Sequence, residues 1–195
     1  MAVSLQKGQK VSLTKGNDGL SQLIVGLGWD QAEKPKGLFA RKPRNIDCDA
    51  SAILLRNGHF MGKKDIVYFG HLSHESGAVI HKGDNLTGEG EGDDEQIFVD
   101  LSRVPADVDR IVIVVNIYQG AARGQHFGMI RNAFTRIVDG RNNSEMLRYS
   151  LTDDYSGMLA MLFGEIYRNG TEWKFNALGQ GTVDNNIAEL ANRFV

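Results

Sequence analysis

The fold is indicated most clearly by residues 159–178, which read LAMLFGEIYRNGTEWKFNAL. Two runs rich in apolar and aromatic residues flank Asn169-Gly170 in this stretch. An Asn-Gly pair between two such runs favours a β-hairpin with a type I′ turn, because both residues tolerate positive φ. The run Ile111-Val112-Ile113-Val114-Val115 is apolar throughout. It is typical of a central strand that is buried on both faces.

Short apolar runs separated by turn residues recur along the rest of the chain, which has 23 glycines and 3 prolines. This pattern predicts an all-β fold, a β-sandwich of two mainly antiparallel sheets. The remaining strands are expected at Gln22–Gly28, Ile46–Leu55, Ile66–Phe69, Ala78–His81, Gln96–Leu101, Ala133–Val138 and Glu145–Leu151.

One or two short helices complete the prediction. Apolar residues recur at helical spacing between Val183 and Phe194, which predicts a C-terminal helix with Asp184 as its N-cap. A second short helix is expected to start near Gln125.

Composition excludes several classes of protein. The chain has 195 residues, of which 42% are hydrophobic and 24% charged, so it is expected to be globular rather than disordered. Cys48 is the only cysteine, which rules out an intramolecular disulfide. The sequence has neither an apolar signal core at its start nor a membrane-spanning apolar run, so a cytoplasmic location is expected.

Acidic residues are concentrated in one window although the net charge is only −2. Residues 84–95 carry six acids and no base. A second, basic cluster lies within residues 34–44, where a solvated loop is a better interpretation than a nucleic-acid site. The acidic window predicts a bound cation.

Two segments carry the candidate ligands. Residues 45–51 read NIDCDAS, and strand alternation places Asp47 and Asp49 on one face, about 7 Å apart. Residues 83–95 read GDNLTGEGEGDDE and offer many oxygen ligands but no histidine or cysteine. Calcium takes about 6–8 oxygen ligands, whereas zinc prefers nitrogen or sulfur. The residues are not spaced as in an EF-hand. The alternative is a solvated strand face and a solvated acidic loop.

The same segments resemble the TerD family, the tellurium-resistance and general stress proteins of bacteria. The resemblance is carried by Gly26-Leu27-Gly28-Trp29-Asp30, Asp47-Cys48-Asp49-Ala50-Ser51, residues 83–95, Val104-Pro105, Phe127-Gly128, residues 162–168 and Glu172-Trp173-Lys174-Phe175. It spans essentially the whole chain and implies one calcium-binding β-sandwich domain over residues 1–195. With the acidic pattern, it predicts one or two Ca²⁺ ions held by Asp47, Asp49, Asp84, Asn85, Glu89, Glu91, Asp93, Asp94 and Glu95.

The sequence departs from the family pattern at several places. Asn45 replaces the first acid of the strand motif, which removes one charge from the predicted site. Tyr118-Gln119 replaces a His-Asp pair, and Val183-Asp184-Asn185-Asn186 replaces a glycine-rich stretch. These departures indicate a diverged paralogue with changed partner contacts.

Three other features are weaker candidates for a site. Asp30 follows a predicted strand end and is as well explained by a turn as by an ion site. The His71-x-x-His74 spacing lacks a third ligand, so a metal role is not favoured. Cys48 is expected to face the apolar side of its strand and to be a poor nucleophile.

The favoured function is therefore a non-enzymatic calcium-binding stress protein that acts as a sensor or scaffold. Its partners are expected to be other, unidentified stress-response proteins, with neither nucleic acid nor an evident small-molecule substrate. The alternative is a calcium-dependent module that binds membrane surfaces. A metal-dependent hydrolase is disfavoured because the sequence indicates no substrate pocket or general base.

Overall fold

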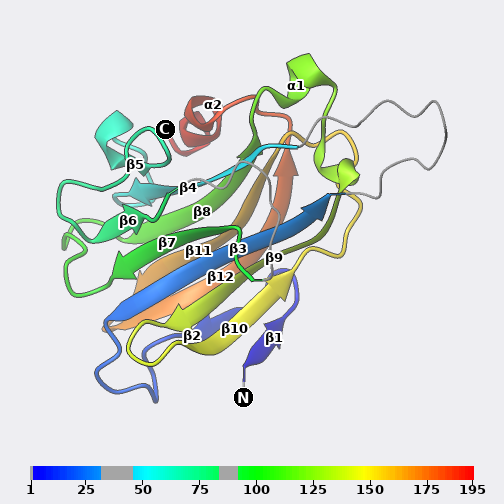
Figure 1. Cartoon of the computed structure of the whole chain (residues 1–195). Helices are drawn as coiled ribbons and strands as arrows, with labels where there is room; N and C mark the ends of the chain where they lie inside the picture. The colour runs from blue at the N-terminus through cyan, green and yellow to red at the C-terminus, as the bar shows by residue number, and fades with distance from the viewer. Residues whose placement is uncertain (1, 32–45, 84–91) are drawn as a thin grey trace.

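The computed structural model describes residues 2–31, 46–83 and 92–195. Two six-stranded sheets lie face to face (Figure 1). Sheet A has the strand order β1 (Val3–Leu5), β10 (Ser144–Ser150), β9 (Ile130–Asp139), β3 (Gln22–Gln31), β7 (Glu95–Asp100), β6 (Val79–His81). Sheet B has the order β2 (Lys10–Ser12), β12 (Glu172–Thr182), β11 (Ala160–Asn169), β8 (Arg110–Ile117), β4 (Cys48–Leu55), β5 (Ile66–Val67). The predicted sandwich of mainly antiparallel sheets is confirmed, since β1–β10 is the one parallel pair among the described strands.

The main core lies between the sheets because side chains alternate across each strand. On β4, Cys48, Ala50, Ala52 and Leu54 face this core. Ile53 and Leu55 face the other way, into a second apolar cluster that also includes Leu190 and Ala191 near the C-terminus. Sheet B is therefore covered on both faces, which explains why every residue of β4 is buried.

The apolar run at Ile111–Val115 was predicted correctly as a central strand. It lies within β8, which is bonded to β11 on one side and to β4 on the other. The final hairpin also forms, between β11 and β12, but its turn differs from the predicted one. Asn169 pairs with Glu172, so the two loop residues are Gly170 and Thr171, and only Gly170 has positive φ. A type I′ turn needs positive φ at both, so that prediction was wrong.

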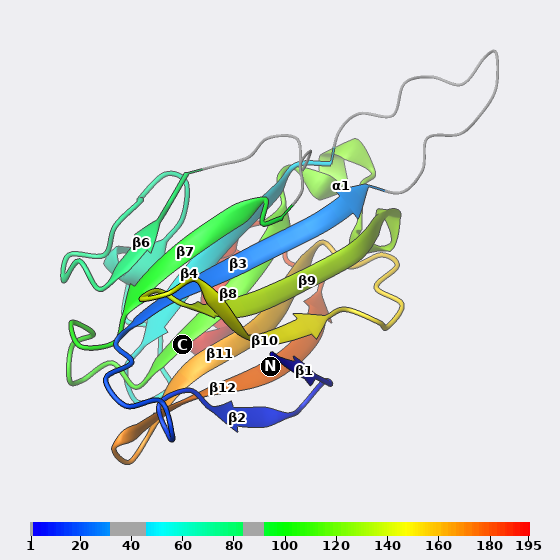
Figure 2. The ribbon, with the colours of Figure 1, turned by 60° about the horizontal axis from the view of Figure 1, so that its bottom comes forward.

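Two strands near the N-terminus were not predicted. β1 joins sheet A beside β10, and β2 joins sheet B beside β12. Figure 2 shows both strands together at the N-terminal side of the sandwich. Each has only three residues, too few for a periodic pattern, and each is formed by partners more than 100 positions away.

The helices are short. α1 (Gly120–Arg123) and the 3₁₀ turn η2 (Phe127–Met129) lie on either side of Gln125, where one helix was expected to start. The C-terminal helix is α2 (Ile187–Ala191), followed by η3 (Asn192–Phe194); η1 (Lys63–Asp65) precedes β5. The N-cap of α2 is Asn186, whose Oδ1 accepts from the N–H groups of Ala188 and Glu189. The prediction of Asp184 as cap was wrong, because that carboxylate pairs with Arg193. Among the described residues, no helix is long and apolar enough to cross a membrane.

Candidate metal centre

The acidic strand lies at the start of β4, next to the end of β8. Asp49 is on the side of β4 opposite to Cys48, and only 4% of it is exposed. It pairs across the sheet with Asn116, whose Nδ2 donates to Asp49 Oδ2 at 3.4 Å. Asp47 precedes the strand, and its carbonyl oxygen accepts from the N–H of Tyr118 at 2.8 Å. The end of β8 therefore holds the backbone of Asp47 and the side chain of Asp49.

Glu95 and His81 join sheet A to this part of β4. The Glu95 carboxylate accepts a hydrogen bond from the N–H of Ala50, and His81 Nε2 lies 3.2 Å from the carbonyl oxygen of Ala50. The N–H of Gly83 donates to His81 Nδ1 at 3.1 Å, so Nε2 is the nitrogen that donates to the carbonyl oxygen of Ala50. His81 Nε2 also lies 3.6 Å from Glu95 Oε2.

These contacts fix both ends of the predicted acidic loop against the acidic strand. Gly83 and Glu95 flank that loop, and both are linked to Ala50, directly or through His81. β5 pairs with β4 only at Ala52 and Ile53. At Ala50, no strand among the described residues lies on that side of β4. The side chains of Glu95 and His81 instead bond to the N–H and the carbonyl oxygen of Ala50, which a neighbouring strand would otherwise bind.

Asp93 lies in a different environment, on the outer face of sheet A. Arg136 donates to it through Nε at 2.7 Å and Nη2 at 3.0 Å, and Gln96 Nε2 donates at 3.0 Å. Gly26 makes room for this pair, because a Cβ there would overlap the Asp93 carboxylate. The structure thus places Asp93 and Asp49 on opposite outer faces of the sandwich.

Asp94 lies at the end of β3 and is fixed by two backbone contacts. Its N–H donates to the carbonyl oxygen of Leu27, and its Oδ2 accepts from the N–H of Trp29, both at 2.8 Å. Burial raises the pKa of Asp94, the bond from Trp29 partly offsets this, and the negative charges of Asp30 and Asp93 raise it further. The Asp30 carboxylate accepts a hydrogen bond from Asn132 Nδ2 at 2.7 Å. Asp30 lies within β3, which continues to Gln31.

The charges of four predicted ligands affect the pKa of one group, the thiol of Cys48. Burial raises the pKa of this thiol well above its ordinary value. The negative charges that raise it further belong to Asp49, Glu95, Asp47 and Asp94. Cys48 is 1% exposed and faces the core, so its predicted orientation and weak nucleophilicity agree with the structure.

The described residues do not make a complete metal site by themselves. Asp84, Asn85, Glu89 and Glu91 lie outside the described residues, as does Asn45. In the described part of the chain, no group of three or more His, Cys, Asp or Glu side chains is arranged to hold a metal ion. The calcium prediction thus depends on the segment between Gly83 and Gly92.

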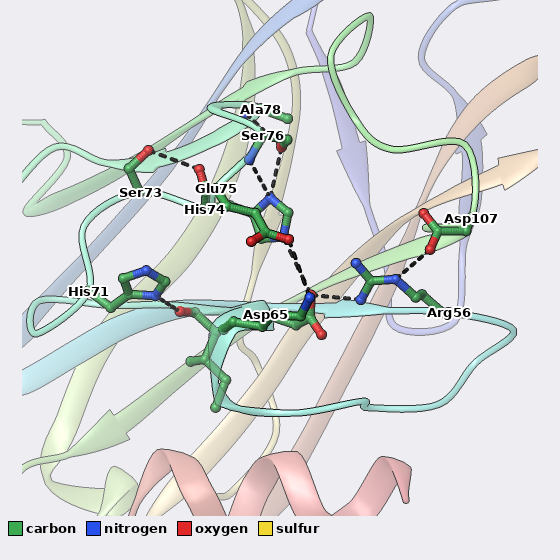
Figure 3. A network of polar contacts seen from close by, with 11 residues as sticks. Arg56, Asp65, His71, Ser73, His74, Glu75, Ser76, Ala78 and Asp107 are labelled. Carbon is green, nitrogen blue, oxygen red and sulfur yellow. Dashed lines mark hydrogen bonds and ion pairs between the residues drawn. The ribbon is translucent and has the colours of Figure 1, made fainter.

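The two histidines of the His-x-x-His spacing have separate partners (Figure 3). His71 Nδ1 lies 2.7 Å from the carbonyl oxygen of Ile66. His74 Nε2 lies 3.4 Å from Asp65 Oδ1, and its Nδ1 accepts from the N–H of Ser76. The disfavoured metal role therefore receives no support from this geometry.

Asp65 is the centre of a charged network that the sequence did not indicate. Its side chain is fully buried, and Arg56 Nη1 lies 2.6 Å from Asp65 Oδ1. Arg56 Nε also binds Asp107, whose side chain is 64% exposed. Nothing in the spacing of these three residues predicts their contact, because a buried ion pair is formed by tertiary structure alone. His81 could have been suspected from its place two residues before Gly83, and Asn116 from being the one polar residue within the apolar run of β8.

Comparison with known proteins agrees with this fold. A family model described as "TerD domain" matches residues 1–194. The chain is 52% identical to stress response protein SCP2 of Bacillus subtilis, with 100% of both chains covered. It is 47% identical to tellurium resistance protein TerD of Serratia marcescens, covering 93% of this chain and 91% of that protein. The crystal structure of a homologue of that protein, SCO6318 from Streptomyces coelicolor A3(2), aligns with a TM-score of 0.63 at 22% identity, over 87% of this chain and 95% of that one.

Proposed function

Because the chain belongs to the TerD family of stress and tellurium-resistance proteins, we propose that it binds calcium and acts as a sensor or scaffold in a stress response. The observation that carries the proposal is that Glu95 accepts a hydrogen bond from the N–H of Ala50, the residue after Asp49, so the acidic loop ends beside the acidic strand. Carboxylates on the loop and on the strand would repel one another unless a cation lay between them. Their oxygen chemistry suits calcium.

The residues present fit a calcium ion in one further respect. Gly83 and Glu95, which flank the remaining acidic residues, are both anchored to Ala50, next to Asp49. An ion held between the loop and the strand would draw on ligands from both without moving the strands. Asp47, Asp49, Asp94 and Glu95, with the oxygens of residues 84–91, would hold it. Asp93 contributes less in this proposal, because Arg136 and Gln96 already bind its carboxylate.

The role proposed for the ion is to order a surface that another protein recognises. A calcium ion neutralises charge and fixes a loop against a rigid sheet, and a partner can distinguish that surface from the calcium-free one. Liposome co-sedimentation with and without calcium separates this role from binding to a membrane surface.

A catalytic role is not part of the proposal. Ser76, His74 and Asp65 have the residue types of a hydrolytic triad, with Ser76 Oγ 2.7 Å from His74 Nδ1. However, the His74 and Asp65 side chains have no exposed surface, so a substrate cannot reach them. Ser76 Oγ also accepts from the N–H of Ala78, so the arrangement closes a local turn.

The test is calorimetric titration of the calcium-stripped protein with calcium, in millimolar magnesium. Saturable binding of one or two ions is expected, and Asp49→Asn or Glu95→Gln should weaken it about tenfold or more, since ligand charge sets affinity. Asp18→Asn is the matched control: Asp18 is an exposed acid before the start of β3, at the opposite end of that strand from Asp94. It should bind calcium as the unchanged protein does.

Thermal unfolding provides a second readout. Calcium at about 100 times its dissociation constant should stabilise the fold by about 2.7 kcal/mol, because it binds only the native state. The proposal is refuted if the stripped, folded protein shows neither binding heat nor a calcium-dependent shift of its melting temperature.

A further inference from the structure

A cavity of about 430 Å³ lies at the β5 edge of sheet B, between residues 63–71 and the start of α2. β5 and α2 share the outer apolar cluster of this sheet, and Figure 1 shows them close together near the C-terminus. The volume is within the range of about 300–1,000 Å³ that is usual for small-molecule sites. The cavity is separate from the proposed calcium site, because its lining includes none of Asp47, Asp49, Asp94 and Glu95.

The walls of the cavity are largely apolar. Ile66 and Ile187 line it, and both pack in the outer apolar cluster. Tyr68 adds an aromatic ring, which meets the ring of Phe69 edge-on with the centroids 5.3 Å apart. A Cβ on Gly70 would lie 2.7 Å from Tyr68 Cε2, so this glycine lets the turn close against the ring and fix its position. Such walls are suited to an apolar or aromatic group.

The charged side chains in the lining are all basic. They are Lys63 and Lys64, with the ring of His71 beside them, and none of the described lining residues is acidic. Lys64 lies 3.3 Å from Glu75, but the two side chains are 62% and 64% exposed, so the pair is weak. Lys63 has no ion pair with any of the described residues. The Lys63 ammonium therefore keeps its donors for a ligand, and the charge of the lining favours an anion.

Contacts outside the cavity fix each segment that lines it. Asp65, which follows the two lysines, is buried and lies 2.6 Å from Arg56. Tyr68 and His71 exchange both backbone hydrogen bonds across a two-residue turn. Leu190 is fully buried and anchors α2 against the sheet. A ligand would thus enter walls that are already formed, which lowers the ordering cost of binding.

We propose that this cavity binds a small aromatic carboxylate. Its carboxylate would accept hydrogen bonds from the Lys63 ammonium, and its ring would lie among Ile66, Tyr68 and Ile187. Apolar walls with a few well-placed polar groups are the usual composition of a small-molecule site. A cation of the same shape would meet the two lysines and be repelled.

The experiment compares three ligands with the same ring system and different charge: naphthoate, naphthamide and naphthylmethylammonium. Binding to the calcium-stripped, folded protein is followed by calorimetry and by amide chemical shifts, in a buffer free of other organic anions and of chelator. Naphthoate should bind saturably with a dissociation constant of about 1 mM or below. Naphthamide should bind about tenfold more weakly because the charge is lost, and the ammonium compound not measurably. The largest shifts are expected within residues 63–71 and 187–188.

Variants at one lysine test the role of its charge. Lys63→Glu should weaken naphthoate binding about tenfold or more, whereas Lys63→Arg should keep the affinity within about threefold. Lys15→Glu is the matched control, since Lys15 is exposed, lies between β2 and β3 and does not line the cavity. It makes the same change in net charge and should leave the affinity unchanged.

Four results would overturn the proposal. They are the absence of saturable naphthoate binding, equal affinity for the ammonium compound, equal effects of Lys63→Glu and Lys15→Glu, and shifts concentrated away from the cavity. Each of these results leaves the calcium proposal intact, because calcium binding is measured in a separate titration and involves other residues.

Discussion

Replacing Arg56 tests the buried charged network most sharply, because one guanidinium has two carboxylate partners in opposite environments. The Asp65 side chain is 0% exposed and the Asp107 side chain is 64% exposed, and both lie within 2.7 Å of Arg56 nitrogens. Arg56→Met keeps most of the apolar stem but leaves the Asp65 carboxylate buried without its cation. Asp107→Ala removes only an exposed partner.

The two variants should differ strongly in stability. Removing one member of a buried pair costs about 3–5 kcal/mol, and we expect the lower end, about 3 kcal/mol, because Arg56 keeps 17% of its side chain exposed. Asp107→Ala should change the stability far less, because exposed ion pairs contribute little. For a chain of this length, 3 kcal/mol corresponds to a loss of about 6–12 °C in melting temperature.

Urea unfolding at neutral pH measures both values. The double variant Arg56→Met, Asp65→Asn should recover part of the loss, because the asparagine carries no charge and still accepts from His74. If Arg56→Met and Asp107→Ala agree within about 0.5 kcal/mol, or if the double variant is less stable than Arg56→Met alone, the burial argument is wrong.

Three further outcomes are expected. Ellman's reagent at pH 8 should leave Cys48 unmodified in the native protein and modify it in urea, since the thiol is buried and its pKa is raised; rapid native labelling would contradict this. Hydrogen bonds from Arg141 lower the pKa of Asp139, so the pair stabilises the fold above the ordinary carboxyl pKa of about 4 and this contribution is lost as pH falls through the lowered value. The difference in urea midpoint between the unchanged protein and Arg141→Ala should accordingly be larger at pH 6 than at pH 2.5, and an equal or larger difference at pH 2.5 would disprove it. Gly170→Ala should cost about 1–2 kcal/mol because φ is 63° there, whereas Gly170→Asn should cost less; equal losses would show that the turn conformation is not the cause.

The strands that could be predicted from the sequence are those with their own local pattern. β8 and the β11–β12 pair are long enough for composition and turn residues to define them. The predicted type I′ turn was wrong because the sequence spacing does not fix the register of the hairpin. Asn169 pairs with Glu172, so the loop is Gly170-Thr171 and not Asn169-Gly170. β1 was not predicted, since its strand conformation comes from β10 and not from its own residues.

The candidate site likewise has residues that a local pattern predicts and contacts that depend on tertiary structure. Asp49 could be predicted from strand alternation, because a period of two decides which side of β4 it occupies. The contact between His81 and Ala50 could not, because it joins the two sheets and depends on how they stack. Asp93 illustrates the limit of reasoning from composition: a run of acids does not reveal that one of them turns to the far face and binds Arg136.

The two N-terminal strands have a consequence for how the chain is made. Val3 pairs with Leu147, and Val11 pairs with Phe175, so each of these strands is synthesised more than 100 residues before its partner. Until β10 and β12 have been synthesised, β1 and β2 have no strand to join. In the finished protein they cover the open edges of β10 and β12, where a foreign strand could otherwise add. A bulky group fused ahead of β1 that kept both strands from docking would leave these two edges open, and each sheet could then pair with a strand of another molecule.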